Sequence, residues 1–151
     1  MELGRLRTLR GQITAAAGTG KVNLVVADGL INYGLRILRF RMWPVLAPQG
    51  LNTVSYTGIL SLDPILAGES MNAATNRQIA WTYGSALGAP TPVNIQHDRE
   101  IIDPDHIVNR DMYLTLDNTT QGVYNYLIEA QVVSLTDDEA IITIIKETSQ
   151  A

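Results

Sequence analysis

The clearest alternation of hydrophobic and polar positions runs from Leu35 to Val45, LRILRFRMWPV. A period of two residues predicts a β-strand with one face turned toward a core. The apolar face is assigned Leu38, Phe40 and Met42, and the opposite face Ile37, Arg39, Arg41 and Trp43. The stretch therefore predicts a long strand whose outer face carries two guanidinium groups and an indole ring.

Further strands are predicted wherever short alternating or β-branched runs are bounded by turn-forming residues. These runs cover residues 3–14, 21–26, 53–62, 77–83, 93–95, 107–116 and 123–133. The small, Gly-rich residues 15–20 predict a hairpin turn, and so does DNTTQG at 117–122. Gly58, inside one predicted strand, indicates a bulge or a close approach of the backbone to a neighbour.

The final segment, residues 136–149, fits a short helix better than a strand. Thr136 and Glu139 have the spacing of a capping box, and acidic residues fill the predicted first turn. One helical face then carries Ala140, Ile141, Ile144, Ile145 and Thr148. The competing feature is the density of β-branched residues in AIITIIKET, which favours a strand.

These elements predict an all-β fold, namely a single antiparallel β-sandwich over residues 1–151 with about eight strands and a jelly-roll-like character. Residues 1–12 form either a basic N-terminal arm or the first strand. A parallel α/β fold would need helices between the strands, and the pattern shows none. Residues 63–76 and 84–106 are predicted to be long loops, which commonly carry contacts with partners.

The composition fits a subunit of an assembly and a monomer with a neutral surface about equally well. Only 17% of the 151 residues are charged, so uncharged polar groups or neighbouring subunits must cover much of the surface. Residues 1–41 hold seven basic and two acidic side chains, net +5, whereas residues 42–151 hold four and thirteen, net −9. Such asymmetry orients a subunit against a complementary neighbour. With no cysteine, disulfides and thiolate sites are excluded.

No catalytic signature is present, and we expect neither an enzyme nor a cofactor. The run HDREIIDPDH, residues 97–106, is read as an acidic loop. Within it, Asp103 and Asp105 are a weak candidate for calcium, with a turn capped by these carboxylates as the favoured alternative. No apolar run approaches the ~20 residues that span a bilayer, so we expect no membrane association.

Two sets of side chains are candidates for binding. Trp81 and Tyr83 share one strand face and fit a core, an interface or a sugar-stacking platform. Arg39 and Arg41 suit phosphates, the acidic part of a neighbouring copy such as its 97–106 loop, or simple solvation that aids solubility. The acidic isoelectric point of about 5.0 makes a protein neighbour the favoured partner and nucleic acid the less favoured one.

The chain resembles the small β-sandwich structural proteins of virus and phage particles, single jelly rolls and capsid decoration proteins among them. The resemblance lies in the basic start (Arg5, Arg7 and Arg10), about eight strands with long loops, few charges, and the paired runs DMYLTLDN and GVYNYLIEAQVV. It implies a capsid or capsid-decorating protein that packs against other copies and other virion proteins after synthesis in the host cytoplasm. Interface residues would then include Arg5, Arg7, Arg10, Arg39, Arg41 and Trp43. A carbohydrate-binding or receptor-binding module using Trp81 and Tyr83 is the alternative.

Overall fold

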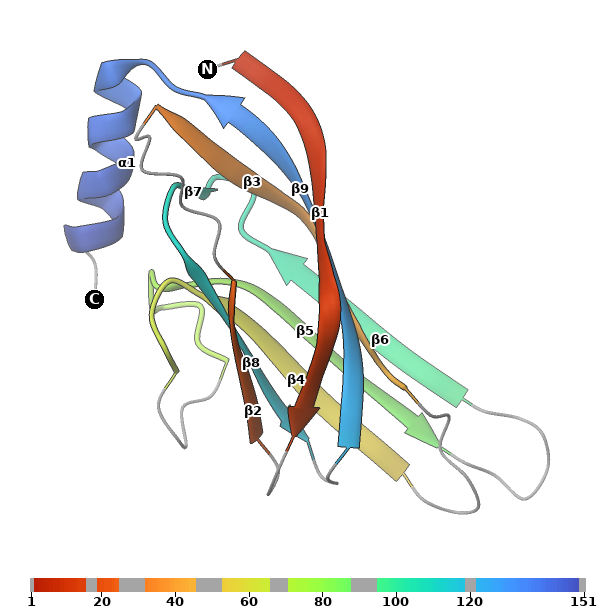
Figure 1. Ribbon diagram of the computed structural model, residues 1–151. Coiled ribbons are helices and arrows are strands. Elements are labelled where there is room, and N and C mark those ends of the chain that lie inside the picture. The colour runs from red at the N-terminus through yellow and green to blue at the C-terminus, as the bar shows by residue number, and fades with distance from the viewer. Residues whose placement is uncertain are drawn as a thin grey trace.

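The computed structural model describes residues 2–15, 19–24, 32–45, 53–65, 71–87, 95–118 and 122–149. These residues form nine strands and one helix, and the strands make two packed antiparallel sheets (Figure 1). The all-β sandwich predicted from the hydrophobic pattern is confirmed. Among the described residues, no helix has the length and apolar character needed to cross a membrane.

The strands divide between a four-stranded and a five-stranded sheet. The four-stranded sheet has the order β1 (Glu2–Ala15), β9 (Gly122–Ser134), β3 (Tyr33–Pro44), β7 (Ile107–Val108). The five-stranded sheet has the order β2 (Thr19–Leu24), β8 (Met112–Asn118), β4 (Thr53–Ser61), β5 (Gln78–Leu87), β6 (Ile95–Ile102). Helix α1 (Asp137–Ser149) follows β9 and lies beside β3 and β7 (Figure 1).

The pairing follows a jelly-roll plan. When β6 is set aside, the first strand pairs with the last, the second with the second last, and so on: β1 with β9, β2 with β8, β3 with β7, β4 with β5. Successive pairs lie in alternate sheets, so the chain is one long antiparallel double strand wrapped around the core. Eight strands in such an arrangement constitute a jelly roll. β6 extends it as an added edge strand beside β5.

The two predicted hairpins are wrong. β1 and β2 belong to different sheets, as do β8 and β9, so each connection crosses the sandwich. Turn residues signal a reversal of the chain, but the partner of the next strand depends on packing between distant segments. The described ends of the two crossings are neighbours, since Ala15 lies opposite Gly122 and Thr19 lies opposite Asp117.

A bulge in β3 changes which side chains face the core. The register with β9 shifts by one residue between Ile37 and Arg39, which leaves Leu38 as the extra residue. Phe40 and Met42 are buried as predicted, but Ile37 is buried instead of facing outward and Leu38 is 40% exposed. The predicted alternation is therefore correct from Arg39 onward and wrong before the bulge.

The core lies between the sheets, where the inward side chains of both interdigitate. The rings of Tyr56 and Tyr124 meet there at 5.3 Å, and the Tyr56 hydroxyl donates to the backbone oxygen of Met42 at 2.9 Å. A side chain at Gly58 would collide with the sulfur of Met42 and lie 3.0 Å from Thr82 Cγ2. The prediction of a close approach at Gly58 is confirmed, and its cause is contact with the opposite sheet.

The predicted acidic loop at 97–106 is a strand over most of its length. β6 covers residues 95–102, and only 103–106 form a turn before the short β7. The charged residues led to the prediction of a loop, but an edge strand also keeps much of its side-chain surface in water and can carry such residues. For the short strand predicted at 93–95, residues 93 and 94 lie outside the described part and Ile95 begins β6.

Both ends of the chain adopt regular structure in the described residues. Within the basic segment 1–12, the described residues 2–12 are part of β1, so the strand alternative holds for them. The predicted terminal helix is confirmed as α1. Its capping box is formed as expected: Thr136 N–H donates to Glu139 Oε2 at 2.9 Å, and Glu139 N–H donates to Thr136 Oγ1 at 3.3 Å.

Candidate interaction surfaces

Four of the six predicted interface residues come together on the outer face of the four-stranded sheet. Arg10 on β1 and Arg41 on β3 both lie opposite Leu127 of the central strand β9. Arg39 lies opposite Glu129, and Trp43 lies opposite Asn125. Directly opposed residues have Cβ atoms about 5 Å apart. We call Arg10, Arg39, Arg41 and Trp43 the basic face.

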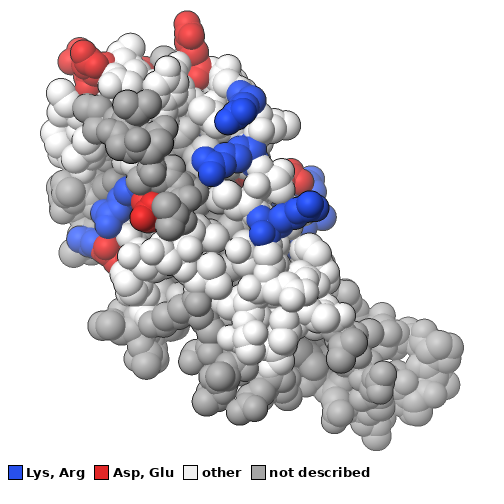
Figure 2. All heavy atoms as spheres, in the orientation of Figure 1, with Lys and Arg blue, Asp and Glu red and all other residues white. Residues whose placement is uncertain are grey.

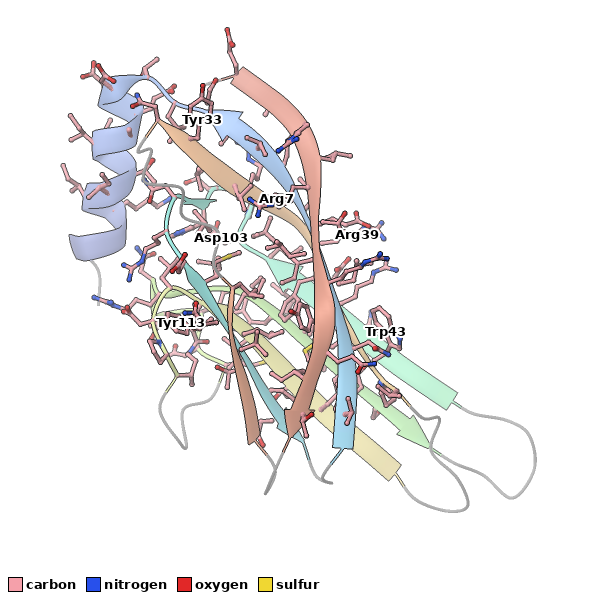
Figure 3. All side chains as sticks on the ribbon, viewed as in Figure 1. Arg7, Tyr33, Arg39, Trp43, Asp103 and Tyr113 are labelled. Atoms are coloured by element: carbon pink, nitrogen blue, oxygen red, sulfur yellow. The ribbon has the colours of Figure 1, made fainter. Side chains whose placement is uncertain are left out.

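The other two predicted arginines lie elsewhere on β1. Arg7 is opposite Ala130, whose side chain belongs to the core, so Arg7 projects from the inner side of the sheet. Figure 3 shows Arg7 and Arg39 on opposite sides of the sheet, with Trp43 on the side of Arg39. Arg5 falls within an irregularity of register between Leu3 and Leu6. Figure 2 shows Lys and Arg side chains following β1, and acidic side chains at the first turn of α1.

Arg41 already has an acidic neighbour within its own chain. Its Nε lies 4.0 Å from Glu100 Oε2, and the same oxygen accepts the backbone N–H of Phe40 at 3.1 Å. Residues 97–106 thus do supply an acidic partner for Arg41, as the sequence suggested for a neighbouring copy, but the observed contact is intramolecular. The composition offered no means of separating these two cases.

The carboxylates proposed as a weak calcium site are engaged in other contacts. Asp103 Oδ1 accepts the backbone N–H of Asp105 at 3.0 Å, which is the turn-capping alternative. Asp105 Oδ2 lies 2.8 Å from Lys146 Nζ, and this hydrogen bond and the lysine charge hold the pKa of Asp105 below its usual value. Among the described residues, no group of three or more His, Cys, Asp and Glu side chains is placed to hold a metal ion.

Trp81 and Tyr83 share the outer face of the five-stranded sheet but differ in exposure. Trp81 is buried against Ile59 and Ile65, and its Nε1–H donates to Gln78 Oε1 at 2.8 Å. Tyr83 is 40% exposed. Of the two rings in the sugar-stacking interpretation, Tyr83 is therefore accessible and Trp81 is not.

Helix α1 presents Ala140 and three of its polar side chains to the body of the protein. Ala140 is fully buried with Val133 and Leu135, and Glu139, Thr143 and Lys146 line a hollow of about 360 Å³ beneath the helix. Two contacts hold α1 in place besides the Lys146–Asp105 pair. Asn32 Nδ2 donates to Asp137 Oδ1, and Asn76 Nδ2 donates to the backbone oxygen of Lys146.

The isoleucines of α1 face outward. Ile141, Ile142, Ile144 and Ile145 are all exposed, with Ile142 the most exposed at 64%. A helix on the surface of a monomer normally has the reverse arrangement, with its apolar stripe toward the core. We call these four residues the isoleucine face. The sequence grouped Ile141, Ile144 and Ile145 on one side but gave no indication that this side points away from the sandwich.

The first half of β1 is a second exposed apolar feature. β1 is an edge strand of the four-stranded sheet, and Leu3 and Leu6 are exposed at 59% and 70%. Both lie on the outer side of the sheet, opposite Val133 and Gln131. We call Leu3 and Leu6, with Arg5 between them, the β1 tip. The imperfect alternation of residues 3–14 carried no signal for this exposure.

Comparison with known proteins supplies no family for the chain. No protein-family model matches the sequence, and no curated protein is similar enough to count as a relative. Function is therefore inferred from the fold and the surfaces described above.

Proposed function

We propose that this protein is a structural component of a virus particle, most simply a phage, that forms or decorates the capsid by packing against copies of itself and other virion proteins. The observation that carries the proposal is the isoleucine face of α1. Four large apolar side chains on one short helix are exposed, although Ile142 also borders the hollow beneath the helix that Glu139, Thr143 and Lys146 line. Such an arrangement is favourable only when another surface covers the helix.

The energetic scale supports this reasoning. Burying an isoleucine side chain contributes roughly 1.5–3 kcal/mol relative to leaving it exposed. An isolated chain forgoes half or more of this contribution at Ile141, Ile142 and Ile145, which are 51–64% exposed, and a smaller part at Ile144, which is 37% exposed. Contiguous exposed apolar side chains rimmed by polar residues mark interaction sites, and Asp137 and Asp138 provide such a rim here. A chain with only 17% charged residues also has an unusually neutral surface for a monomer.

The fold is consistent with the proposal without establishing it. Jelly rolls form viral capsid proteins, lectins and cupins, so the architecture raises the expectation of a capsid role by analogy only. The basic face would set the register between neighbours, because charge complementarity contributes to orientation more than to affinity. Nucleic acid is a less favoured partner for this face, since Glu100 and Glu129 lie among its arginines.

A carbohydrate-binding or receptor-binding module is the second candidate. Exposed Tyr83 supports it, because a sugar ring stacks on an accessible aromatic face. Burial of Trp81 leaves this candidate with less support than the assembly role. Loss of glycan-array binding in Tyr83→Ala, with folding retained, would favour it over a purely structural role.

Two measurements test the assembly role. Light scattering and negative-stain electron microscopy of the purified full chain, over a range of concentrations, should show oligomers that grow with concentration. Mass spectrometry of gradient-purified particles, from a culture that carries the coding sequence, should find the chain in amounts comparable with other virion proteins. A monomer at every concentration, together with absence from such particles, would overturn the proposal.

A further inference from the structure

We propose that the isoleucine face of α1 in one copy docks on the β1 tip of a second copy, in a head-to-tail contact. The inference rests on the self-packing part of the proposed function and names the two surfaces that meet. Both surfaces are exposed in the isolated chain, so neither covers the other within one molecule. Each offers large aliphatic side chains of the kind that fill the centre of a protein interface.

The two surfaces lie at the same end of the four-stranded sheet. Leu3 of β1 lies opposite Val133 of β9, and Val133 packs in one cluster with Ala140 of α1. α1 also reaches the β7 edge of the sheet, where Ile107 packs against the same cluster and Lys146 bonds to Asp105 just before β7. Both surfaces remain exposed there, so two neighbouring copies can each meet one of them.

Charge complementarity favours the β1 tip of a second copy as the surface that covers the isoleucine face. The first turn of α1 carries exposed Asp137 and Asp138 beside the isoleucine face. The β1 tip carries exposed Arg5, whereas Arg7 projects from the inner side of the sheet and is not part of this rim. Opposite charges at the rim of an apolar contact favour this pairing and fix its orientation.

Pairing of β1 with β1 of a second copy is disfavoured by the same charges. An antiparallel pair related by a two-fold axis at Leu6 would place each Leu6 against the other, and Arg5 of one strand opposite Arg7 of the partner, twice. Like charges directly opposite each other destabilise a strand pair. The isoleucine face, with its acidic rim, does not meet this repulsion.

The geometry of the contact has a consequence for assembly. The proposed contact is heterologous, since the two surfaces of one copy meet two different neighbours, and it therefore closes into a ring or continues as a filament. A two-fold pair that made the same contact twice would stop at a dimer. Each copy then uses its α1 toward one neighbour and its β1 toward the other. This gives a chain-to-chain contact that a shell or a ring on a particle would use repeatedly.

Two variants of the full chain separate the surfaces. The helix variant carries Ile141→Ser and Ile145→Ser, and the strand variant carries Leu3→Ser and Leu6→Ser; all four side chains are exposed, so folding should be retained. Each variant alone should associate about tenfold more weakly than the wild type, or not at all. Ile101→Ser, at an exposed position on β6 in the other sheet, is the matched control and should associate as the wild type does.

The decisive measurement is native mass spectrometry of the two variants mixed in equal amounts. Because the helix variant retains its β1 tip and the strand variant retains its isoleucine face, the mixture should form a one-to-one dimer that grows no further. Failure of the folded variants to combine, or a strand variant that associates as the wild type does, would overturn the inference. Circular dichroism of each variant establishes that it is folded.

Failure of this inference is distinguishable from failure of the proposed function. If the wild type associates and both variants associate equally well, other surfaces carry the assembly and only the head-to-tail contact is wrong. If the wild type is a monomer at every concentration, the self-packing itself is wrong and the head-to-tail contact falls with it.

Discussion

The Glu100 carboxylate on β6 accepts the backbone N–H of Phe40 on β3 at 3.1 Å, although the two strands belong to different sheets. β7 pairs with β3 only at Leu35 and Arg36, so no described strand of the same sheet offers an acceptor beside Phe40 on that side. Glu100 supplies one from the opposite sheet. A single side chain therefore joins the two sheets at the side where the four-stranded sheet is open.

Removal of this acceptor should destabilise the sandwich. Glu100→Ala leaves the N–H of a buried strand residue without its carboxylate partner, and we expect a loss of about 1–3 kcal/mol in the free energy of unfolding. Glu100→Gln keeps an acceptor oxygen and should lose less. Urea unfolding followed by tryptophan fluorescence measures both. Equal stability of the two variants would mean that the hydrogen bond contributes nothing.

Gly58 should tolerate no side chain. Gly58→Ala places a methyl group against Met42 and Thr82 of the packed interior, and overpacking of this kind costs about 1–3 kcal/mol. Gly122→Ala is the matched control, because the nearest atom to a side chain there, Tyr124 Cε2, lies at an ordinary 3.7 Å. Thermal unfolding should show a lower midpoint for the first variant only. A Gly58→Ala variant as stable as Gly122→Ala would contradict the close approach.

The Asp105–Lys146 pair should make a small, pH-dependent contribution to stability. The hydrogen bond and charge of Lys146 lower the pKa of Asp105 from its usual 3.8 in the folded protein. The contribution is therefore fully present above that usual value and is lost as the pH falls through the lower, folded-state value. Because Asp105 is largely exposed, its size should stay below about 1 kcal/mol.

Asp105→Asn tests the direction of this pH dependence. The difference in unfolding free energy between wild type and variant should be present at about pH 6 and should shrink at about pH 2.5. Measurement at low salt and again at about 1 M salt provides the control, since screening should reduce the difference. A difference that is constant with pH would show that the carboxylate charge is not its source.

Substitution of Trp81 should lower the free energy of unfolding far more than substitution of Tyr83, because the first ring is packed and the second is exposed. Trp81→Ala removes a buried ring from its contacts with Ile59 and Ile65 and leaves Gln78 without its indole donor, which should cost about 3 kcal/mol. Tyr83→Ala, at an exposed position, should change stability by less than about 0.5 kcal/mol. Chemical unfolding compares the two. Equal losses would mean that the exposures of the two rings are not as described.

The capping box should control the stability of α1. Thr136→Ala removes the side-chain acceptor of Glu139 N–H, and loss of such a cap costs about 0.5–2 kcal/mol. Thr136→Ser retains a hydroxyl and should preserve the cap. Hydrogen exchange of the α1 amides should accelerate in the alanine variant alone. Unchanged exchange would place the stability of α1 in its other contacts.

The fold class was predictable because a period of two residues leaves a direct trace in the sequence. Strand faces were recovered at Phe40 and Met42, and the helix start was recovered because Thr136 and Glu139 interact over one turn. The basic face was recovered in part, since Arg39, Arg41 and Trp43 alternate along one strand. Addition of Arg10 required the pairing of β1 with β9, which no local pattern contains.

The sequence alone determined those features that depend on neighbours a few residues apart, namely the strand periodicity and the capped helix. At Gly58 it left a bulge or a close approach open, and contact with the opposite sheet decided between them. Only the tertiary structure decided which strands pair, why Leu38 is expelled at the β3 bulge, and that Glu100 serves Phe40 across the sandwich. The physical reason is that these outcomes depend on contacts between segments far apart along the chain. The outward orientation of the α1 isoleucines, on which the functional proposal rests, is also a feature that only the tertiary structure decided.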